Sequence, residues 1–279
     1  EFIKDGPNTI NNAELNRVKA FFTEPHYNKD TKNNLESHIQ DKPFSQWLSR
    51  CTQSHKKNYY RSVTLSLKSN HQAPGDATSE QMQYVADLAD EYSFGEIRVS
   101  HEQNLILADV HEDNLYELWN KAKNHHLATP NIGLITDIIC CPGGDFCSLA
   151  NAKSIPIAES IQQVFDDMDY LHDIGDINLN ISGCMNACGH HHVGHIGILG
   201  VDKDGSEWYQ VTLGGNQGNF ANIGKVIGPS FSADEMPVVI RKIVDTYVKK
   251  RHSDETFIDC VIRIGLEPFK LTVYGKKAN

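Results

Sequence analysis

Two cysteine-containing stretches, CPGGDFC at residues 141–147 and SGCMNACGH at residues 182–190, decide which kind of fold this chain can form. The first places five residues between its cysteines, and the second places three. Each stretch follows an apolar run typical of a strand, and each is rich in small residues, so its backbone can fold closely around a compact inorganic group. We therefore expect strand-end loops in an α+β domain that hold a metal or a cluster.

The whole set of cysteines argues against a disulfide framework. The chain has seven, an odd number, and its first thirty residues lack the apolar segment of an export signal. Structural zinc is one alternative, but its usual cysteine pair encloses about two residues, which neither pair here does. Buried structural thiols are the other alternative, and we expect that role for Cys51, Cys140 and Cys260. The spacing favours a metal or cluster without naming a partner cofactor.

Length and composition limit the remaining possibilities. The 279 residues, 39% of them hydrophobic, allow one large domain or two modest ones. A net charge of -10 argues against nucleic acid as a partner, and no apolar stretch approaches the roughly 18 residues of a membrane span. We expect a cytoplasmic protein with no membrane partner. Because the sequence begins with Glu1, we also expect a fragment or a processed product.

Hydrophobic periodicity divides the chain into three parts. Residues 1–57 are polar and are expected to form a connecting arm with weak helices at 13–22 and 44–51. Residues 58–129 show the order strand, helix, strand, strand, helix, with a capping box formed by Thr78 and Gln81 at the first helix. This order predicts a small open α+β sandwich.

Residues 130–279 form the third part and contain the cysteine motifs. Strands are expected at 134–139, 177–181, 196–201 and 208–213, and one helix from about residue 157 to 168. A capping box of Ser232 and Glu235 precedes a long helix that should end at the basic run 249–251. The fold class expected for the whole chain is therefore α+β.

The cysteine motifs resemble the two-part signature of the sirohaem-dependent sulfite and nitrite reductases. CPGGDFCSLA at 141–150 matches the first part and SGCMNACGH at 182–190 the second. Further matches follow in the family's order: IRVSHEQNL at 97–105, GHIGILG at 194–200, LGG at 213–215 and ETF at 255–257. The resemblance covers about residues 60–270, and the run 184–200 is most similar to proteobacterial sulfite reductase haemoproteins. It implies the carboxy-terminal half of such an enzyme, a ferredoxin-like half domain followed by a sirohaem- and [4Fe–4S]-binding α+β domain.

The resemblance also implies a ligand set at the matching positions. Cys141, Cys147, Cys184 and Cys188 would ligate a [4Fe–4S] cluster, and Cys188 would also be the axial thiolate of the sirohaem iron. Such a shared sulfur removes any through-space gap between the cluster and the iron that binds substrate.

Other matching positions would contact the macrocycle or the substrate. Asn186 would face the macrocycle, and the turn at Gln103 and Asn104 and the glycines Gly214 and Gly215 are further candidates for cofactor binding. Arg98 is the candidate for binding the oxyanion substrate, with a strand-surface arginine as the equal alternative. In the family, much of the anion-binding charge comes from the first half, so an isolated second half should not close the active site.

The activity implied is the six-electron reduction of sulfite to sulfide. Nitrite reduction to ammonia by the same cofactors is the close alternative, and a cluster-bearing electron-transfer module without sirohaem is the alternative from another class. The implied partners are the amino-terminal half of the same protein, a small oxyanion, and an electron donor that is either a flavoprotein subunit or a ferredoxin.

A histidine-rich stretch, GHHHVGH at 189–195, suggests a metal box at first sight. Adjacent histidines in one loop cannot all face a single ion, so we favour a supporting or solvated loop. The run GGNQG at 214–218 lacks the lysine and hydroxyl residue that follow a nucleotide-binding loop.

Overall fold

The computed structural model describes residues 10–32, 35–70 and 72–275. The chain divides into two compact units, Glu1–Asp30 and Thr31–Asn279. The first unit contains helix α1 (Asn12–Lys19), which begins where the Asn11 side chain accepts a hydrogen bond from the Glu14 backbone N–H. It is shorter than the helix expected at 13–22, and it buries no side chain.

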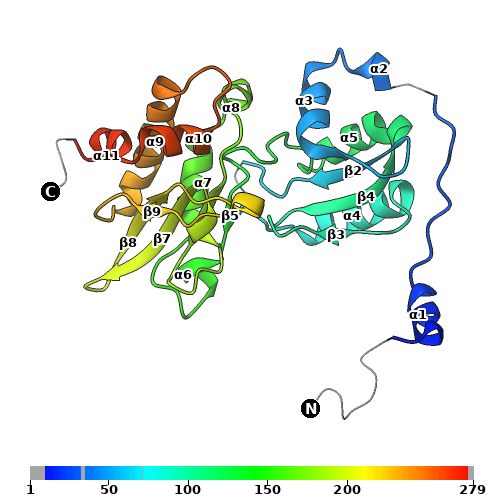
Figure 1. The fold of residues 1–279 in the computed structure, drawn as a ribbon, viewed down its shortest axis with the longest axis horizontal. Helices are drawn as coiled ribbons and strands as arrows, with labels where there is room; N and C mark the ends of the chain where they lie inside the picture. The colour runs from blue at the N-terminus through cyan, green and yellow to red at the C-terminus, as the bar shows by residue number, and fades with distance from the viewer. Residues whose placement is uncertain (1–9, 33–34, 71, 276–279) are drawn as a thin grey trace, which may run out of the picture. The chain divides into compact units, whose positions relative to one another are not determined.

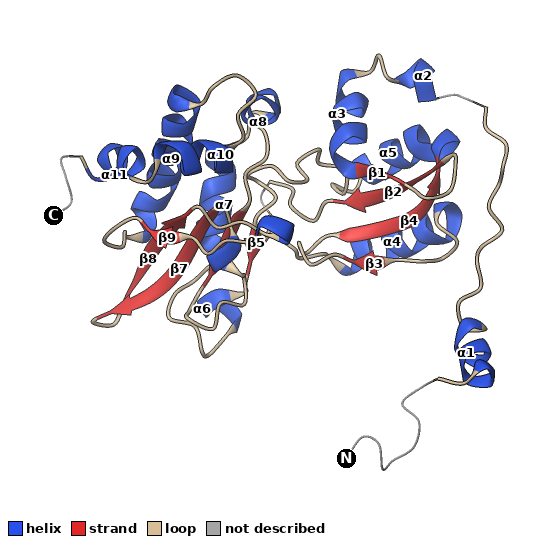
Figure 2. Ribbon diagram, in the orientation of Figure 1, coloured by secondary structure: helices blue, strands red, loops and turns tan. Residues whose placement is uncertain are grey.

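The second unit begins with a half domain built on a four-stranded antiparallel sheet in the order β1-β2-β4-β3 (Figure 2). Helix α4 starts at the capping box of Thr78 and Gln81, as expected. The elements, in chain order, are α2 (Leu35–His38), α3 (Lys42–Cys51), β1 (Thr52–Ser54), β2 (Tyr60–Leu65), α4 (Ser79–Tyr92), β3 (Arg98–Val99), β4 (Leu105–His111), η1 (Glu112–Asn114) and α5 (Leu115–Lys123). The order strand, helix, strand, strand, helix from β2 onward confirms the sequence expectation.

The structure corrects the expected arm of residues 1–57. Helix α3 is capped by the Asp41 side chain, and it buries Phe44, Trp47 and Cys51 completely. These side chains belong to the same apolar core as the strands and α5, and β1 pairs with β2. The half domain therefore begins before residue 58. The error arose because α3 is short and lies in a polar stretch, and only its burial against the sheet reveals its role.

The second domain is built on a five-stranded mixed sheet in the order β5-β6-β7-β8-β9 (Figure 1). Strands β5, β6 and β7 are parallel, and β7, β8 and β9 are antiparallel. Helix α9 contacts α7, α10 and α11. The elements, in chain order, are β5 (Ile139–Cys140), α6 (Gly143–Phe146), α7 (Ile155–Val164), α8 (Met168–Ile174), β6 (Leu179–Ser182), η2 (His191–Val193), β7 (Ile196–Lys203), β8 (Ser206–Leu213), η3 (Gly218–Phe220), β9 (Lys225–Val226), η4 (Ala233–Glu235), α9 (Met236–Lys250), α10 (Phe257–Ile264) and α11 (Glu267–Tyr274).

Several expectations for this domain are wrong in detail. The strand expected at 134–139 is reduced to Ile139–Cys140, because the preceding residues form turns closed by Leu134 N–H to Asn131 O and Asp137 N–H to Leu134 O. The helix expected to reach residue 168 ends at Val164, and α8 starts afresh behind the Asp167 cap. The capping box of Ser232 and Glu235 is present, and α9 ends in the basic run.

A buried polar network joins the half domain to the second domain. Lys68, with 0% of its side chain exposed, donates from Nζ to Asp137 Oδ1 at 3.0 Å and to Glu102 O at 2.7 Å. Asn104 also donates to Asp137 Oδ1, and the other carboxylate oxygen accepts from Gly133 N–H. Two ions taken out of water in this way depend on each other and on the surrounding hydrogen bonds.

Replacing Lys68 by methionine should lower the free energy of unfolding by about 3–5 kcal/mol, because the Asp137 carboxylate would stay buried without its cation. Urea unfolding measures the change. The matched control is Lys42→Met, which breaks an ion pair to Asp169 between the same two domains but with both side chains about two-thirds exposed, 67% and 64%. That change should cost less than about 1 kcal/mol. Equal losses in the two variants would contradict the importance of burial at Lys68.

Among the residues described, no helix is both long and apolar enough to span a membrane.

Candidate cluster and cofactor site

The first cysteine loop leaves the edge strand β5 and makes a single helical turn. Cys141 lies directly after the strand, and its backbone N–H donates to Ile181 O on the neighbouring strand β6. The short helix α6 follows, and Cys147 closes it with a hydrogen bond from its N–H to Gly143 O at 2.9 Å. The turn therefore places Cys147 one helical turn after Gly143.

The second cysteine loop leaves β6 and doubles back against it. Gly189 N–H donates to Ser182 Oγ, and a Cβ placed on Gly189 would lie only 2.0 Å from Ile181 O. Ala187 and His190 adopt left-handed backbone angles, with φ of 57° and 53°. Glycine at 189 and two positive φ angles let the chain from Cys184 to Cys188 make a compact loop.

The two loops touch each other through Gly183. Its N–H donates to Cys141 Sγ at 3.1 Å, and its carbonyl accepts from the N–H groups of Asn151 and Ala152. A Cβ on Gly183 would lie 2.6 Å from Ala152 O and 2.9 Å from Gly143 Cα, so only glycine fits. Gly183 was not among the residues predicted for the site, although a glycine immediately before a cysteine at a strand end indicates such a close contact.

The exposure of the four motif cysteines is graded. Cys141 and Cys184 are each 8% exposed, Cys147 is half-buried, and Cys188 is exposed. Within the described residues, no three His, Cys, Asp or Glu side chains converge on one point as ligands of a single ion would. A cubane cluster takes a thiolate at each of several irons, and the two hydrogen-bonded loops contain four cysteines in all.

Apolar side chains stand exposed on both cysteine loops. Phe146 is 78% exposed, Leu149 72% and Met185 82%. Asn186 and Cys188 are exposed beside them. This apolar surface around the ligands suits contact with a large cofactor or another polypeptide.

Arg98 and the turn beside it lie in the half domain. Arg98 is on the edge strand β3 and is ion-paired with Glu96, with 59% of its side chain exposed. The Gln103 amide is hydrogen-bonded to both backbone groups of Cys140, and Asn104 accepts from Leu67 N–H and donates to Asp137. Both amides are thus occupied within the protein, and their expected contact with a macrocycle stays a prediction, as does the role of Arg98.

The two glycines expected near the cofactor lie after β8. Gly214 has φ of +85°, and its N–H donates to His195 O. A Cβ on Gly215 would lie 2.3 Å from Gly194 O and 2.7 Å from His192 O, so this glycine allows close approach of the loop that follows Cys188. Their contact with sirohaem also stays a prediction.

The histidines of the 189–195 stretch do not form a metal box in the part of the chain that is described. His191 is buried, and desolvation, with a smaller contribution from His192, lowers its pKa to about 4. His195 is buried, accepts from Asn178 N–H at Nδ1, and has a pKa lowered chiefly by burial. The expectation of a supporting or solvated loop stays a prediction, and the burial of His191 and His195 agrees with a supporting role.

The three cysteines outside the ligand set are buried, as expected. Burial is the main cause that raises the pKa of each of the thiols Cys51, Cys140 and Cys260. For Cys140, the neighbouring Cys141 adds to this effect. A thiol that resists ionisation is a poor iron ligand, since the thiolate is the form that binds.

Cys140→Ala and Cys260→Ala should each keep full iron and sulfide content and lower stability by about 1 kcal/mol, as is usual for removal of a small buried group. Cys141→Ala should lose the cluster. Iron and sulfide analysis of the three variants checks this, and loss in Cys140→Ala with retention in Cys141→Ala would show that the wrong cysteine of the adjacent pair had been assigned.

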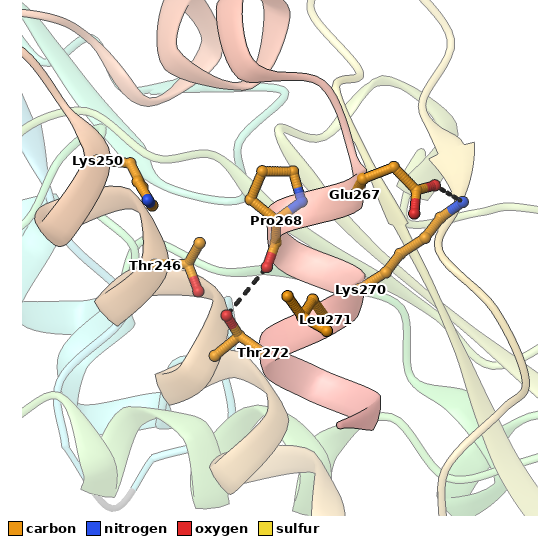
Figure 3. A pocket seen from close by; sticks show the side chains of 7 residues that line it. All are labelled: Thr246, Lys250, Glu267, Pro268, Lys270, Leu271 and Thr272. Atoms are coloured by element: carbon orange, nitrogen blue, oxygen red, sulfur yellow. Dashed lines mark hydrogen bonds and ion pairs between the residues drawn. The ribbon is translucent and has the colours of Figure 1, made fainter. Parts of the chain in front are cut away.

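A hollow of about 570 Å³ lies elsewhere, between α9 and α11 (Figure 3). Several of its polar groups are already paired: Thr272 Oγ1 donates to Pro268 O, and Lys270 is ion-paired with Glu267. The lining residues are Thr246, Lys250, Glu267, Pro268, Lys270, Leu271 and Thr272, none of them from the cysteine loops. It therefore carries no part of the site.

The two domains of the chain match two different family descriptions. Residues 133–279 match the family described as "Nitrite and sulphite reductase 4Fe-4S domain", and residues 53–125 match the "Nitrite/Sulfite reductase ferredoxin-like half domain". The chain belongs to the nitrite and sulfite reductase family. The expected α+β fold, with a ferredoxin-like half domain before the cluster domain, is confirmed. So are the [4Fe–4S] cluster and sirohaem as the cofactors of this family.

The relatives of this chain include both nitrite reductases and sulfite reductases, at similar sequence identity. The chain is 30% identical to the assimilatory ferredoxin-dependent nitrite reductase of Haloferax mediterranei, over 66% of this chain and 32% of that protein. It is 29% identical to the sulfite reductase [NADPH] hemoprotein beta-component of Yersinia pestis, over 65% of this chain and 31% of that protein. The solved NirA protein of Mycobacterium tuberculosis has a TM-score of 0.63 and 26% identity, covering 78% of this chain and 40% of that one. The chain spans about a third of the curated relatives it matches.

Proposed function

We propose that this chain is the cluster-bearing part of an assimilatory sulfite reductase, which reduces sulfite to sulfide in a six-electron reaction. The observation that carries the proposal is the contact of the two cysteine loops, in which Gly183 donates to Cys141 Sγ. That contact joins the two loops that contain the four family-matched cysteines, and the loops follow two neighbouring parallel strands.

The four cysteines differ in exposure, and we assign them different roles on that basis. Cys141 and Cys184 are buried, and with Cys147 they would anchor the cluster in the domain. Cys188 is exposed, so its sulfur would be accessible to sirohaem as well as to the cluster. When bound, the two cofactors would supply electrons to one substrate-binding iron.

The residues of this chain would hold the ligands and shield the cluster. The Gly183 N–H already hydrogen-bonds a ligand sulfur, and such bonds influence the reduction potential of iron–sulfur clusters. Arg98 would contribute to oxyanion binding. Its guanidinium would first have to leave the ion pair with Glu96 and then bind the substrate. Within this proposal Arg98 is a substrate residue, and Asn186 faces the macrocycle.

Nitrite reduction to ammonia is the second candidate. It is favoured by the ferredoxin-dependent nitrite reductase of Haloferax mediterranei, which is as similar to this chain as the sulfite reductase of Yersinia pestis. A cluster-bearing electron-transfer module without sirohaem is the third candidate, and the short span of the chain relative to its relatives keeps that class open.

The proposed partners follow from that span. An amino-terminal half of the same protein would complete the cofactor pocket. The electron donor would be a flavoprotein subunit or a ferredoxin; ferredoxin stands in the name of the Haloferax mediterranei relative and NADPH in that of the Yersinia pestis relative. The proposal places the enzyme in the cytoplasm.

The deciding experiment is kinetic comparison on the protein assembled with the amino-terminal half. With a chemical electron donor, sulfite should give a higher kcat/KM than nitrite, and sulfide should be the product. A preference for nitrite would transfer the assignment to the second candidate. A visible spectrum with the broad, weak absorption of a cluster alone would support the third.

A further inference from the structure

Gln103 links the half domain to the strand that leads into the first cysteine loop. Its amide donates from Nε2 to Cys140 O at 2.8 Å and accepts at Oε1 from Cys140 N–H at 2.8 Å. The two residues are 37 positions apart. Strand β5 is at the edge of its sheet, with β6 on one side only. The amide therefore occupies the place that a further strand would take.

Both hydrogen bonds are made where water has little access. Cys140 is 3% exposed, so its backbone N–H and carbonyl depend on protein partners. On the other side, Cys141 N–H donates to Ile181 O and Cys141 Sγ accepts from Gly183 N–H. The backbone at Cys140 and Cys141 is thus hydrogen-bonded to the half domain on one side and to β6 and Gly183 on the other.

The local backbone presets Gln103 for this contact. The residue has φ of 59°, and its N–H donates to Ser100 O in a tight turn. Gly75 packs against it, since a Cβ on Gly75 would lie 2.9 Å from Gln103 Cβ, and Gly75 itself has φ of +87°. A side chain at position 75 would be strained and would push Gln103 away from Cys140.

We propose that Gln103 is a positioning residue for the cluster ligand Cys141, acting through the backbone of Cys140. It fixes where the thiolate meets the cluster and ties that position to the half domain. A cavity of about 250 Å³ is lined in part by Gln103, Cys140 and Cys141. The cysteine loop therefore has room to shift once the two hydrogen bonds between Gln103 and Cys140 are removed. The inference rests on the proposed function, because it takes Cys141 to be a cluster ligand.

The test compares two glutamines that each bridge two backbone groups. Gln81 in α4 accepts from Thr78 N–H and donates to His125 O, both at 3.0 Å, and is 8% exposed. In the protein assembled with its amino-terminal half, Gln103→Met should release iron to a chelator about tenfold faster or more, as loss of a group that orients a metal ligand commonly does. It should also alter the electron paramagnetic resonance spectrum of the reduced cluster. Gln81→Met should leave the release rate and the spectrum unchanged while lowering thermal stability.

A second variant keeps the test decisive if Gln103→Met does not fold. Gln103→Glu keeps an acceptor for Cys140 N–H, but an ionised carboxylate cannot donate to Cys140 O, so its release rate should lie between those of wild type and Gln103→Met. A wild-type release rate and spectrum in the Gln103 variants, or an equal effect of Gln81→Met, would overturn the inference. In each of these outcomes the wild-type protein still contains its cluster, whereas a wild-type protein without a cluster would instead contradict the assignment of Cys141 as a ligand in the proposed function.

Discussion

Replacing Cys147 with serine is expected to abolish assembly of the [4Fe–4S] cluster. Cys147 lies at the end of the α6 turn, held by its hydrogen bond to Gly143 O. The substitution keeps the size and the backbone geometry of the loop but exchanges a soft thiolate for a hard, weakly acidic hydroxyl, which iron–sulfur clusters accept poorly. Iron and acid-labile sulfide analysis, with the visible spectrum, should show complete loss of the cluster.

The control makes the same atomic change outside the motif. Cys260 is buried in the second domain, and Cys260→Ser should retain full iron and sulfide content while losing some stability. If Cys147→Ser assembled a complete cluster, the ligand assignment would have to move to another residue. If both variants lost the cluster, the effect would be on folding and would carry no information about ligation.

Residues 1–279 expressed alone are expected to reduce neither sulfite nor nitrite with a chemical electron donor. An oxyanion that leaves water needs several positive groups around it. Here Arg98 is paired with Glu96, and Lys153, close to the first cysteine loop in sequence, is paired with Asp145. The exposed Cys188 and the apolar surface around the loops indicate a site that faces outward and is not enclosed by these residues.

Assembly with the amino-terminal half should restore sirohaem absorbance and turnover together. The measurement is steady-state reduction of sulfite and of nitrite by the two preparations, normalised to cluster content. Sustained turnover by residues 1–279 alone would contradict the expectation. It would mean that a second copy of the chain completes the site or that residues 1–60 supply the charge.

The sequence by itself determined the fold class and the family of this chain. Both follow from short-range information: the spacing within each cysteine pair, the glycines beside them, and the alternation of apolar residues in the strands around Leu107 and Ile198. The capping boxes at Thr78 and Ser232 were equally readable, because a helix start depends on residues three positions apart.

Only the tertiary structure decided what the polar residues between the domains do. The amides of Gln103 and Asn104 bind Cys140 and Asp137 across a domain boundary, and no feature of the sequence indicated these partners. The sequence likewise left α3 in an arm, although Trp47 is fully buried in the half-domain core. Such partners lie tens of residues apart, and local periodicity contains no information about which buried backbone group a given amide will reach once the two domains have packed.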